Sequence, residues 1–208
     1  MCGIVGYTGF QDAYDIVING LRRLEYRGYD SAGIVLEDTN NSFEVKKTKG
    51  KVSDLVEISE NLKETSHVGM GHTRWATHGV PSDRNSHPHV SNDGKIALVH
   101  NGIIENYDTI KTMLIGKGFT FSSETDTEVL VNLIQYILDT QKINFSEAVR
   151  YALNEVYGAY AITVMHKDYP GVLVVGRLGS PLAIGLGDKE YFIASDASPF
   201  VEFTKEAV

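Results

Sequence analysis

Cysteine is nearly absent from this sequence, because the single thiol among its 208 residues is that of Cys2. One cysteine cannot form a disulfide within the chain, and such scarcity is typical of proteins in a reducing compartment. Long hydrophobic runs are absent too, since none approaches the roughly 20 apolar residues that cross a bilayer. The first ten residues hold no basic segment, and Asp12 follows too early for the apolar part of a signal peptide. We therefore expect a cytoplasmic protein that does not enter a membrane.

Positive charge is also in short supply, with 19 Lys and Arg residues against 27 Asp and Glu residues and a net charge of -8. The lysines cluster only within residues 46–51, where Asp54 and Glu57 follow closely. An acidic chain without a basic face is poorly suited to bind a phosphate backbone. Nucleic acid is therefore not an expected partner.

The histidines do not follow a metal-binding pattern. His72 and His78 have neither zinc-finger spacing nor the i, i+4 spacing of a helical pair. His87 and His89 flank a proline, and the chain has no second cysteine to join them. The sequence also lacks a serine nucleophile elbow and a phosphate-binding P-loop. We expect no metal site.

The order of the expected elements favours an α+β fold with antiparallel sheets. Many short apolar or alternating segments are separated by Gly or Asp turns, and the helical segments are grouped rather than strictly alternating with strands. The length suffices for one sizeable core but is short for two independent domains. The pattern does not decide between one sheet and two. Strands are expected at residues 3–7, 33–37, 43–48, 68–73, 96–100, 159–166, 172–175, 182–186 and 191–194, and helices at 13–24, 52–62, 107–115, 126–138, 145–156 and, as a short tail, 201–208.

Cys2 is the first candidate for chemistry. A thiol is a strong nucleophile only as the thiolate, so it needs a base or a lowered pKa. If Met1 is removed, the free α-amine of Cys2, with a pKa of about 7.7–8.0, becomes a base beside a thiol whose pKa is near 8.5. If Met1 stays, that nitrogen is an amide and cannot act as a base. The alternative is that Cys2 is an incidental small residue of an N-terminal strand.

Two later segments carry groups that bind anions. In residues 69–79 an expected strand runs into a loop with Arg74, whose guanidinium presents a two-pronged donor to a carboxylate. The alternative is an exposed arginine at a strand end, beside a packing tryptophan. Asn101 and Gly102 offer a side-chain amide and a backbone N–H that can hold an oxyanion. An Asn-Gly pair is equally a hairpin signal, although the residues after it lead toward a helix.

Residues 123–128 predict a helix start. Thr125 and Glu128 have the spacing of a capping box. The helix dipole favours Asp126 in the first turn without any function, and the alternative is a carboxylate that holds a substrate ammonium group. Near the end of the first helix, Gly28 fits the C′ position. Arg27 beside it is placed to reach the site and steady the N-terminal segment.

Five segments together carry a resemblance. Residues 2–7 (CGIVGY), 21–33 (LRRLEYRGYDSAG), 71–79 (GHTRWATHG), 100–107 (HNGIIENY) and 123–128 (SETDTE) resemble the N-terminal glutaminase domain of the glutamine–fructose-6-phosphate aminotransferases, which are class II glutamine amidotransferases. The resemblance extends over essentially the whole chain. The phosphoribosyl-pyrophosphate amidotransferases rank second, because they share the Cys-Gly start and an Asn-Gly pair but usually differ in the second and third segments.

The resemblance implies an N-terminal-nucleophile hydrolase fold, a four-layer αββα sandwich of two stacked antiparallel sheets, formed by residues 1–208 as one glutaminase domain. It implies hydrolysis of L-glutamine to L-glutamate and ammonia with neither a metal nor an organic cofactor. The matching residues are Cys2 as the nucleophile, with Arg27 as a further candidate, Asn101 and Gly102 as the oxyanion hole, Arg74, Thr77 and His78 at the α-carboxylate, Asp126 with Gly102 at the α-ammonium, and Trp75 on a loop that closes over glutamine.

The family's sugar-phosphate isomerase domain lies beyond this sequence. In the full-length enzyme that domain is expected to use the ammonia to make glucosamine 6-phosphate from fructose 6-phosphate, and the full-length enzyme is expected to be a homo-oligomer. Three alternatives remain open. One is an N-terminal-nucleophile amidase for another amide, in which Arg74 and Asp126 are dispensable. The second is a degenerate binding or regulatory domain, and the third is a histidine metal protein.

Overall fold

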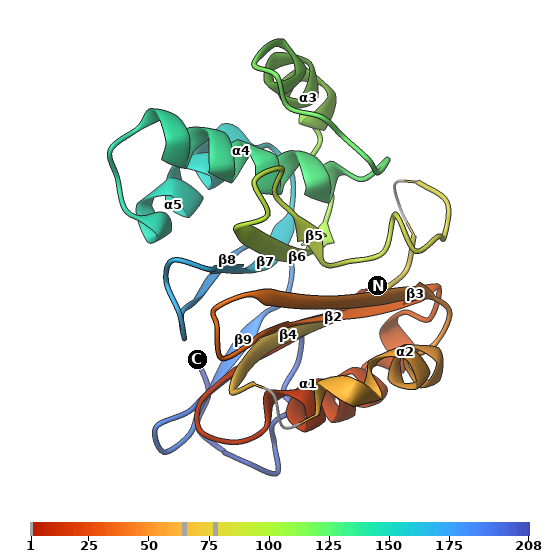
Figure 1. The fold of residues 1–208 in the computed structure, drawn as a ribbon. Coiled ribbons are helices and arrows are strands. Elements are labelled where there is room, and N and C mark those ends of the chain that lie inside the picture. The colour runs from red at the N-terminus through yellow and green to blue at the C-terminus, as the bar shows by residue number, and fades with distance from the viewer. Residues whose placement is uncertain (1, 64–65, 77–78) are drawn as a thin grey trace.

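The computed structural model of the chain describes residues 2–63, 66–76 and 79–208, and its strands form two antiparallel sheets (Figure 1). The six-stranded sheet has the order β3-β2-β4-β1-β10-β9, and the four-stranded sheet has the order β5-β6-β7-β8. The six strands are β1 (Gly3–Thr8), β2 (Ser31–Glu37), β3 (Phe43–Lys49), β4 (Val68–Arg74), β9 (Ala183–Leu186) and β10 (Tyr191–Ala194). The four are β5 (His89–Val90), β6 (Ile96–Gly102), β7 (Tyr160–His166) and β8 (Leu173–Leu178).

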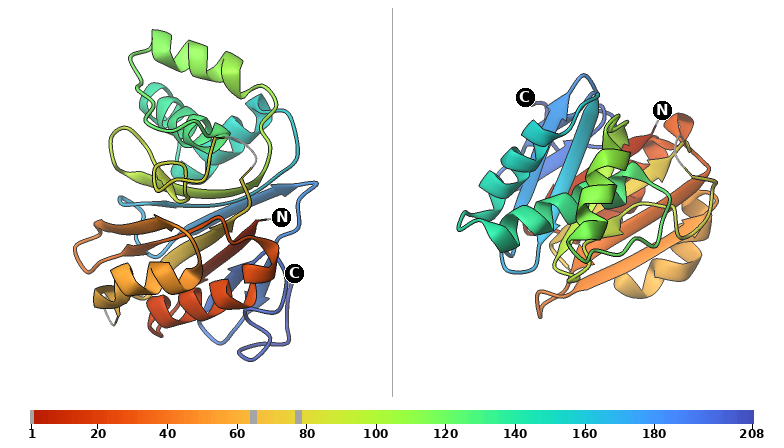
Figure 2. Two further views of the ribbon diagram at one scale, coloured as in Figure 1. Left: turned by 90° about the vertical axis from the view of Figure 1, so that its right-hand side faces the viewer. Right: turned by 90° about the horizontal axis from the view of Figure 1, so that it is seen from above.

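Helices cover the outer face of each sheet, so the molecule has four layers (Figures 1 and 2). Helices α1 (Ala13–Arg23) and α2 (Val52–Ser59) lie on the six-stranded sheet, and 3-10 helices η1 (Glu25–Arg27) and η2 (Glu60–Leu62) follow them. Helices α3 (Tyr107–Gly116), α4 (Asp126–Thr140) and α5 (Phe145–Glu155) lie on the side of the four-stranded sheet. This arrangement confirms the α+β prediction. No helix of the described residues is long and apolar enough to cross a membrane.

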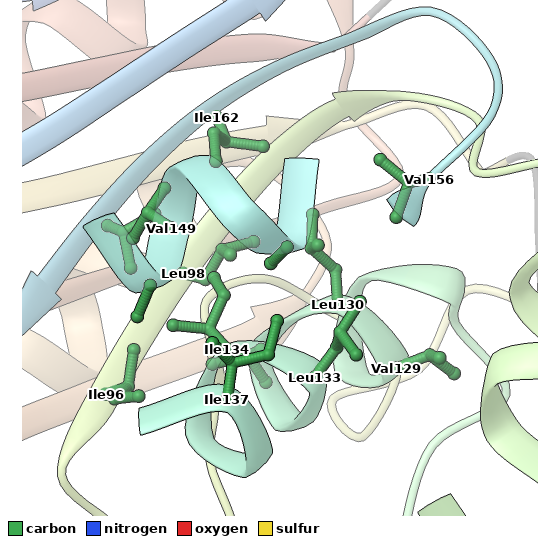
Figure 3. Packing of buried hydrophobic residues seen from close by; sticks show 14 of the residues in the cluster. Ile96, Leu98, Val129, Leu130, Leu133, Ile134, Ile137, Val149, Val156 and Ile162 are labelled. Atoms are coloured by element: carbon green, nitrogen blue, oxygen red, sulfur yellow. The ribbon is translucent and has the colours of Figure 1, made fainter. Parts of the chain in front are cut away.

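Three apolar cores fill the spaces between the four layers. Figure 3 shows the core in which α4 and α5 pack on β6 and β7. Burying one aliphatic side chain contributes about 1.5–3 kcal/mol, so these contacts fix the layers relative to one another. Representative members are Val17 and Leu21 of α1 under the six-stranded sheet, Ile4 and Val99 between the sheets, and Leu98, Ile134 and Val149 in the core of Figure 3.

Helix α4 begins where the sequence predicts, but the hydrogen bonds at its start differ from those of the predicted capping box. Thr125 is the N-cap, and its Oγ1 accepts the Glu128 N–H at 3.3 Å. The prediction of a full capping box is wrong, because the Glu128 carboxylate does not return to the Thr125 N–H. It accepts instead from the backbone and hydroxyl groups of Ser122 and Ser123. This network makes Asp126 the first residue of α4, where it is buried.

The prediction of a helix at residues 201–208 is wrong. The end of the chain lies along β9, where Ile184 and Val208 exchange backbone hydrogen bonds of 2.8 and 3.0 Å, and the Leu186 N–H donates to the Glu206 carbonyl at 2.9 Å. Strand β9 is at the edge of the six-stranded sheet, so its outer backbone groups need partners. The amphipathic pattern of the tail does not reveal that the backbone groups of β9 need partners.

The prediction of Gly28 as a helix C′ residue is also wrong. Helix α1 ends earlier, at Arg23, and Gly28 follows η1 with an extended backbone (φ -170°, ψ 140°). A Cβ on Gly28 would lie 2.8 Å from the backbone carbonyl carbon of Arg74. Glycine therefore serves here to let two segments approach closely. Strand β5, only two residues long, is a further element that the sequence pattern did not reveal.

Candidate active site

Strand ends from both sheets and the start of a helix meet around one small cavity. Strand β1 pairs with β4 in antiparallel register, so Cys2, just before β1, lies beside Arg74 at the end of β4. Gly102 ends β6 in the other sheet, and Asp126 begins α4. In Figure 2 the N-terminal end lies at the edge of the sandwich, level with the boundary between the sheets. The cavity is lined by Cys2, Arg74, Trp75, His87, His100, Gly102, Thr125, Asp126 and Thr127.

The Cys2 thiol lies against the backbone of Trp75. The Trp75 N–H donates to the Cys2 Sγ at 3.2 Å, and the thiol is placed to donate to the Trp75 carbonyl at 3.4 Å. Burial raises the pKa of the Cys2 thiol, while the Trp75 N–H and the charge of Arg74 oppose that shift without cancelling it. The thiol is therefore protonated at neutral pH, and a nucleophile at this position needs a base.

Two side chains hold the carbonyl oxygen of Cys2. Arg27 Nε and Asn101 Nδ2 each donate to it at 3.1 Å. Arg27 also pairs with Asp196 at 3.5 Å, and the Tyr26 hydroxyl donates to the same carboxylate at 2.6 Å. Arg27 thus contacts the N-terminal segment without lining the cavity. Sequence reasoning missed Asp196, for which the available signal was a polar residue soon after an apolar strand.

Asn101 and Gly102 end β6, and of the two only Gly102 lines the cavity. The Asn101 amide contacts Cys2 and two buried side chains described below. Gly102 has a φ of +123°, and a Cβ there would lie 2.0 Å from the carbonyl oxygen of Ala159. Only glycine fits this position without displacing the backbone. The hairpin alternative for the Asn-Gly pair is wrong, because the chain continues through residues 103–106 into α3.

Arg74 is buried, which rules out the alternative of an exposed arginine at a strand end. Its side chain is 3% exposed, and one guanidinium nitrogen donates to the Gly79 carbonyl at 3.2 Å. Burial lowers the pKa of Arg74, and the neighbouring Cys2, Asp126 and Asp30 oppose that shift. A guanidinium keeps its charge even so, since its ordinary pKa lies above 12. Arg74 therefore supplies a fixed positive charge to the cavity.

Asp126 supplies the negative group. Its carboxylate is 4% exposed, and its Oδ2 accepts the Ile104 N–H at 2.8 Å and lies 4.0 Å from Nδ1 of His100. As the first residue of α4, Asp126 also lies in the favourable field of the helix N-terminus. Together with Arg74, it equips the cavity to hold both charged groups of a free α-amino acid beside the Cys2 sulfur.

Trp75 borders the cavity on its solvent side. Its side chain is 46% exposed and meets the Tyr29 ring edge-to-face, with the ring centroids 5.6 Å apart. The next residue is tied down, since the Ala76 N–H donates to Asp30 Oδ2 at 2.8 Å. The predicted site residues Thr77 and His78 lie outside the described residues.

Four buried histidines, His72, His87, His89 and His100, lie at or near the cavity. His87 Nδ1 is 3.2 Å from His72 Nε2, and His89 Nε2 is 3.0 Å from Thr125 Oγ1. Burial lowers the pKa of His72 to about 3 and keeps the pKa of His87 and His89 well below the ordinary value. Within the described ranges, no three His, Cys, Asp or Glu side chains are grouped to hold a metal ion. Sequence reasoning treated His72, His87 and His89 only as possible metal ligands and missed that they form a buried cluster that is uncharged at neutral pH.

Among solved structures, the chain is similar to the glutamine phosphoribosylpyrophosphate amidotransferase of B. subtilis, with 29% identity and a TM-score of 0.82 over 96% of this chain and 43% of that one. A glutamine aminotransferase class-II domain protein of Silicibacter pomeroyi, at 14% identity and a TM-score of 0.58, shares the fold alone. The two stacked antiparallel sheets between helices are accordingly the N-terminal-nucleophile hydrolase fold.

Sequence comparison gives closer relatives. The glutamine–fructose-6-phosphate aminotransferase (isomerizing) of Bacteroides thetaiotaomicron is 53% identical over 208 residues, and one from Thermus thermophilus is 50% identical over 208 residues. Each match covers 100% of this chain and 34% of the relative, so the chain spans about a third of the length of these curated relatives. A family model described as a glutamine amidotransferase domain matches residues 56–207. The chain therefore belongs to the glutamine amidotransferase domain family.

Proposed function

We propose that the chain hydrolyses L-glutamine to L-glutamate and ammonia, with Cys2 as the nucleophile. The observation that carries this proposal is the meeting of a thiol, a buried arginine and a buried aspartate in one cavity. Arg74 pairs with the α-carboxylate of glutamine and Asp126 with its α-ammonium, which places the side-chain amide at the sulfur. Another amide without a free amino-acid end leaves these two buried charges unpaired, which disfavours the broader amidase alternative.

The chemistry requires that Met1 be removed, so that the α-amine of Cys2 is free. The amine takes the thiol proton, and the sulfur attacks the amide carbon of glutamine. The carbonyl oxygen becomes an oxyanion, which the Gly102 N–H stabilises together with the Asn101 amide, whose Nδ2 exchanges its hydrogen bond to the Cys2 carbonyl for one to the oxyanion. The protonated amine then gives its proton to the amide nitrogen, the C–N bond breaks, and ammonia leaves a γ-glutamyl thioester. The same amine takes a proton from water, whose hydroxide releases glutamate and restores the thiol.

Four further residues have supporting roles in this reaction. We assign Thr77 and His78 to the α-carboxylate beside Arg74, and Trp75 to a loop that closes over glutamine. Arg27 steadies the N-terminal segment through the Cys2 carbonyl, the contact that supports this role. No step of the reaction requires a metal or an organic cofactor.

We further propose that residues 1–208 form the glutaminase domain of a cytoplasmic, homo-oligomeric glutamine–fructose-6-phosphate aminotransferase. Its isomerase domain, in the same polypeptide, receives the ammonia and makes glucosamine 6-phosphate from fructose 6-phosphate. Identities of about 50% to enzymes of that name, against 29% to the phosphoribosylpyrophosphate amidotransferase, support this assignment over the alternative.

Mass spectrometry after treatment with a diazo-ketone analogue of glutamine tests the proposal. We expect one adduct, on the Cys2 peptide that lacks Met1, and its suppression by excess glutamine. If Met1 is still attached, an aminopeptidase removes it before the treatment is repeated. A folded, Met1-free chain that forms no adduct and releases no glutamate would overturn the proposed function.

A further inference from the structure

The side-chain amide of Asn101 is held at both ends by buried groups. Its Oδ1 lies 2.9 Å from Nε2 of His72, and its Nδ2 donates to the Cys2 carbonyl at 3.1 Å and to Ser195 Oγ at 2.9 Å. Asn101, His72 and Ser195 are all less than 7% exposed. The direction of this amide matters, because an oxyanion beside Cys2 is stabilised by an N–H and repelled by an oxygen lone pair.

The two oxygens around His72 Nε2 determine where the proton of that ring lies. Nε2 is 2.9 Å from Asn101 Oδ1 and 3.0 Å from the carbonyl oxygen of His100, and in this orientation both oxygens only accept. Nε2 therefore carries the hydrogen, and His72 is the donor to Asn101. His87 Nδ1, 3.2 Å from the same nitrogen, then presents its lone pair. Burial keeps His72 uncharged at neutral pH by lowering its pKa to about 3.

Ser195 does not choose the direction of the amide. Its Oγ accepts from Asn101 Nδ2 and from the Ile4 N–H at 2.8 Å, but a hydroxyl equally donates to an oxygen. If the amide turned over, Ser195 would still have a partner. His72 would instead face a second N–H, and the Cys2 carbonyl would face Oδ1. Two of these contacts therefore set the direction of the Asn101 amide. One is with the Cys2 carbonyl, which belongs to the reacting residue itself, and the other is with His72.

We propose that His72 is a positioning residue of the reaction: its Nε2–H fixes the Asn101 amide with Nδ2 toward Cys2 and so keeps the oxyanion hole in its active form. The inference rests on the proposed glutaminase function. It gives the buried histidine a part in catalysis without contact to the substrate, because its effect passes through Asn101.

A pair of variants separates positioning from packing. His72→Leu keeps the volume but removes the donor, so only the Cys2 carbonyl still favours the active direction of the amide, and we expect kcat for glutamine hydrolysis to fall about tenfold or more with KM changed less than threefold. His72→Gln places an amide N–H near the position of Nε2, and we expect it to restore most of kcat. If His72→Leu does not fold, His72→Met, which also lacks an N–H, replaces it. Alkylation of Cys2 by iodoacetamide needs no oxyanion hole and should proceed at the wild-type rate in every folded variant.

A double-mutant cycle with Asn101→Ala tests the route. If His72 acts through Asn101, His72→Leu causes no further loss of kcat once Asn101 is truncated. His166→Leu is the matched control, since His166 is 7% exposed and belongs to β7, and it should leave kcat unchanged. Equal losses in the Leu and Gln variants, or additive losses in the cycle, would overturn the inference. A wild-type protein that releases no glutamate would instead refute the proposed function.

Discussion

Cys2, the proposed nucleophile, and Asp126, the proposed partner of the α-ammonium, are positioned by contacts of different range. Cys2 is held by Arg27, Trp75 and Asn101, which are 25, 73 and 99 residues away in the sequence. Asp126 begins a helix whose start is fixed by hydrogen bonds between residues 122 and 128. The position of Cys2 therefore depends on the packing of both sheets, while the backbone of Asp126 is set by a local helix start and its carboxylate is held by the Ile104 N–H, 22 residues away.

This difference predicts two kinds of variant. Changes around Cys2 alter the geometry of the reacting atoms, so they should lower kcat. Changes at Asp126 remove a charge that glutamine meets on binding, so they should raise KM.

Replacing the nucleophile should abolish the reaction. We expect Cys2→Ala to release no detectable glutamate from glutamine, because no other thiol is present in the chain. Calorimetry should still detect glutamine binding, since Arg74 and Asp126 are untouched. Glutamate release at the wild-type rate would contradict the assignment of Cys2.

Adding one methyl group at the end of β6 should be nearly as damaging. In Gly102→Ala, the Cβ meets the Ala159 carbonyl and the residue must keep a φ of +123°, so the backbone N–H moves away from the oxyanion. We expect kcat to fall by about 100-fold or more. Gly116→Ala, where a Cβ meets open space at the end of α3, is the control and should leave kcat unchanged. Equal kcat values in the two folded variants would exclude a role for the Gly102 N–H.

Neutralising the carboxylate should act on binding. Asp126→Asn keeps an oxygen that accepts the Ile104 N–H but loses the charge that attracts the α-ammonium. We expect KM for glutamine to rise roughly 10–100-fold, with a smaller change in kcat. Asp139→Asn, at the exposed end of the same helix, is the matched control. An unchanged KM would return Asp126 to a structural role at the helix start.

The buried, uncharged histidines near the cavity should make the stability of the fold sensitive to acid. The folded-state pKa of His72, about 3, lies below its unfolded value near 6.5, so protons favour the unfolded chain. This contribution is complete above pH 6.5 and is lost as the pH falls toward 3, at up to about 1.4 kcal/mol per pH unit. We expect the urea midpoint to decline between pH 7 and pH 4, and to decline less in His72→Gln. Parallel declines in the two proteins would show that His72 is not a source of the acid sensitivity.

Weakening the outer support of Cys2 should have the smallest effect. Asp196→Asn removes the charge that faces Arg27 but leaves Arg27 able to donate to the Cys2 carbonyl. Because a partly exposed ion pair contributes at most about 1 kcal/mol, we expect kcat to fall no more than about fivefold, with KM unchanged. A change confined to KM would indicate that Asp196 acts on glutamine binding instead.

Local signals in the sequence located most elements of the fold. The apolar spacing of α1 and the Thr125 cap of α4 are visible because helix starts and faces depend on neighbouring residues. The helix prediction for residues 201–208 was wrong because the partner of this tail is β9, at the edge of a sheet, and local spacing does not reveal that partner. The prediction of Gly28 as a C′ residue was wrong for a related reason, because the constraint on Gly28 comes from the distant backbone of Arg74.

Four kinds of chemical group could be recognised in the sequence: one thiol next to the N-terminus, an arginine after a strand, an Asn-Gly pair and an aspartate at a helix start. The packing of distant segments brings the thiol, Arg74 and Asp126 into one cavity and brings Arg27 and Asn101 to the Cys2 carbonyl. The same packing places His72 Nε2 2.9 Å from Asn101 Oδ1. The physical reason is that residue types and helix caps are local properties, whereas burial, a pKa and the direction of an amide depend on which distant segments pack together.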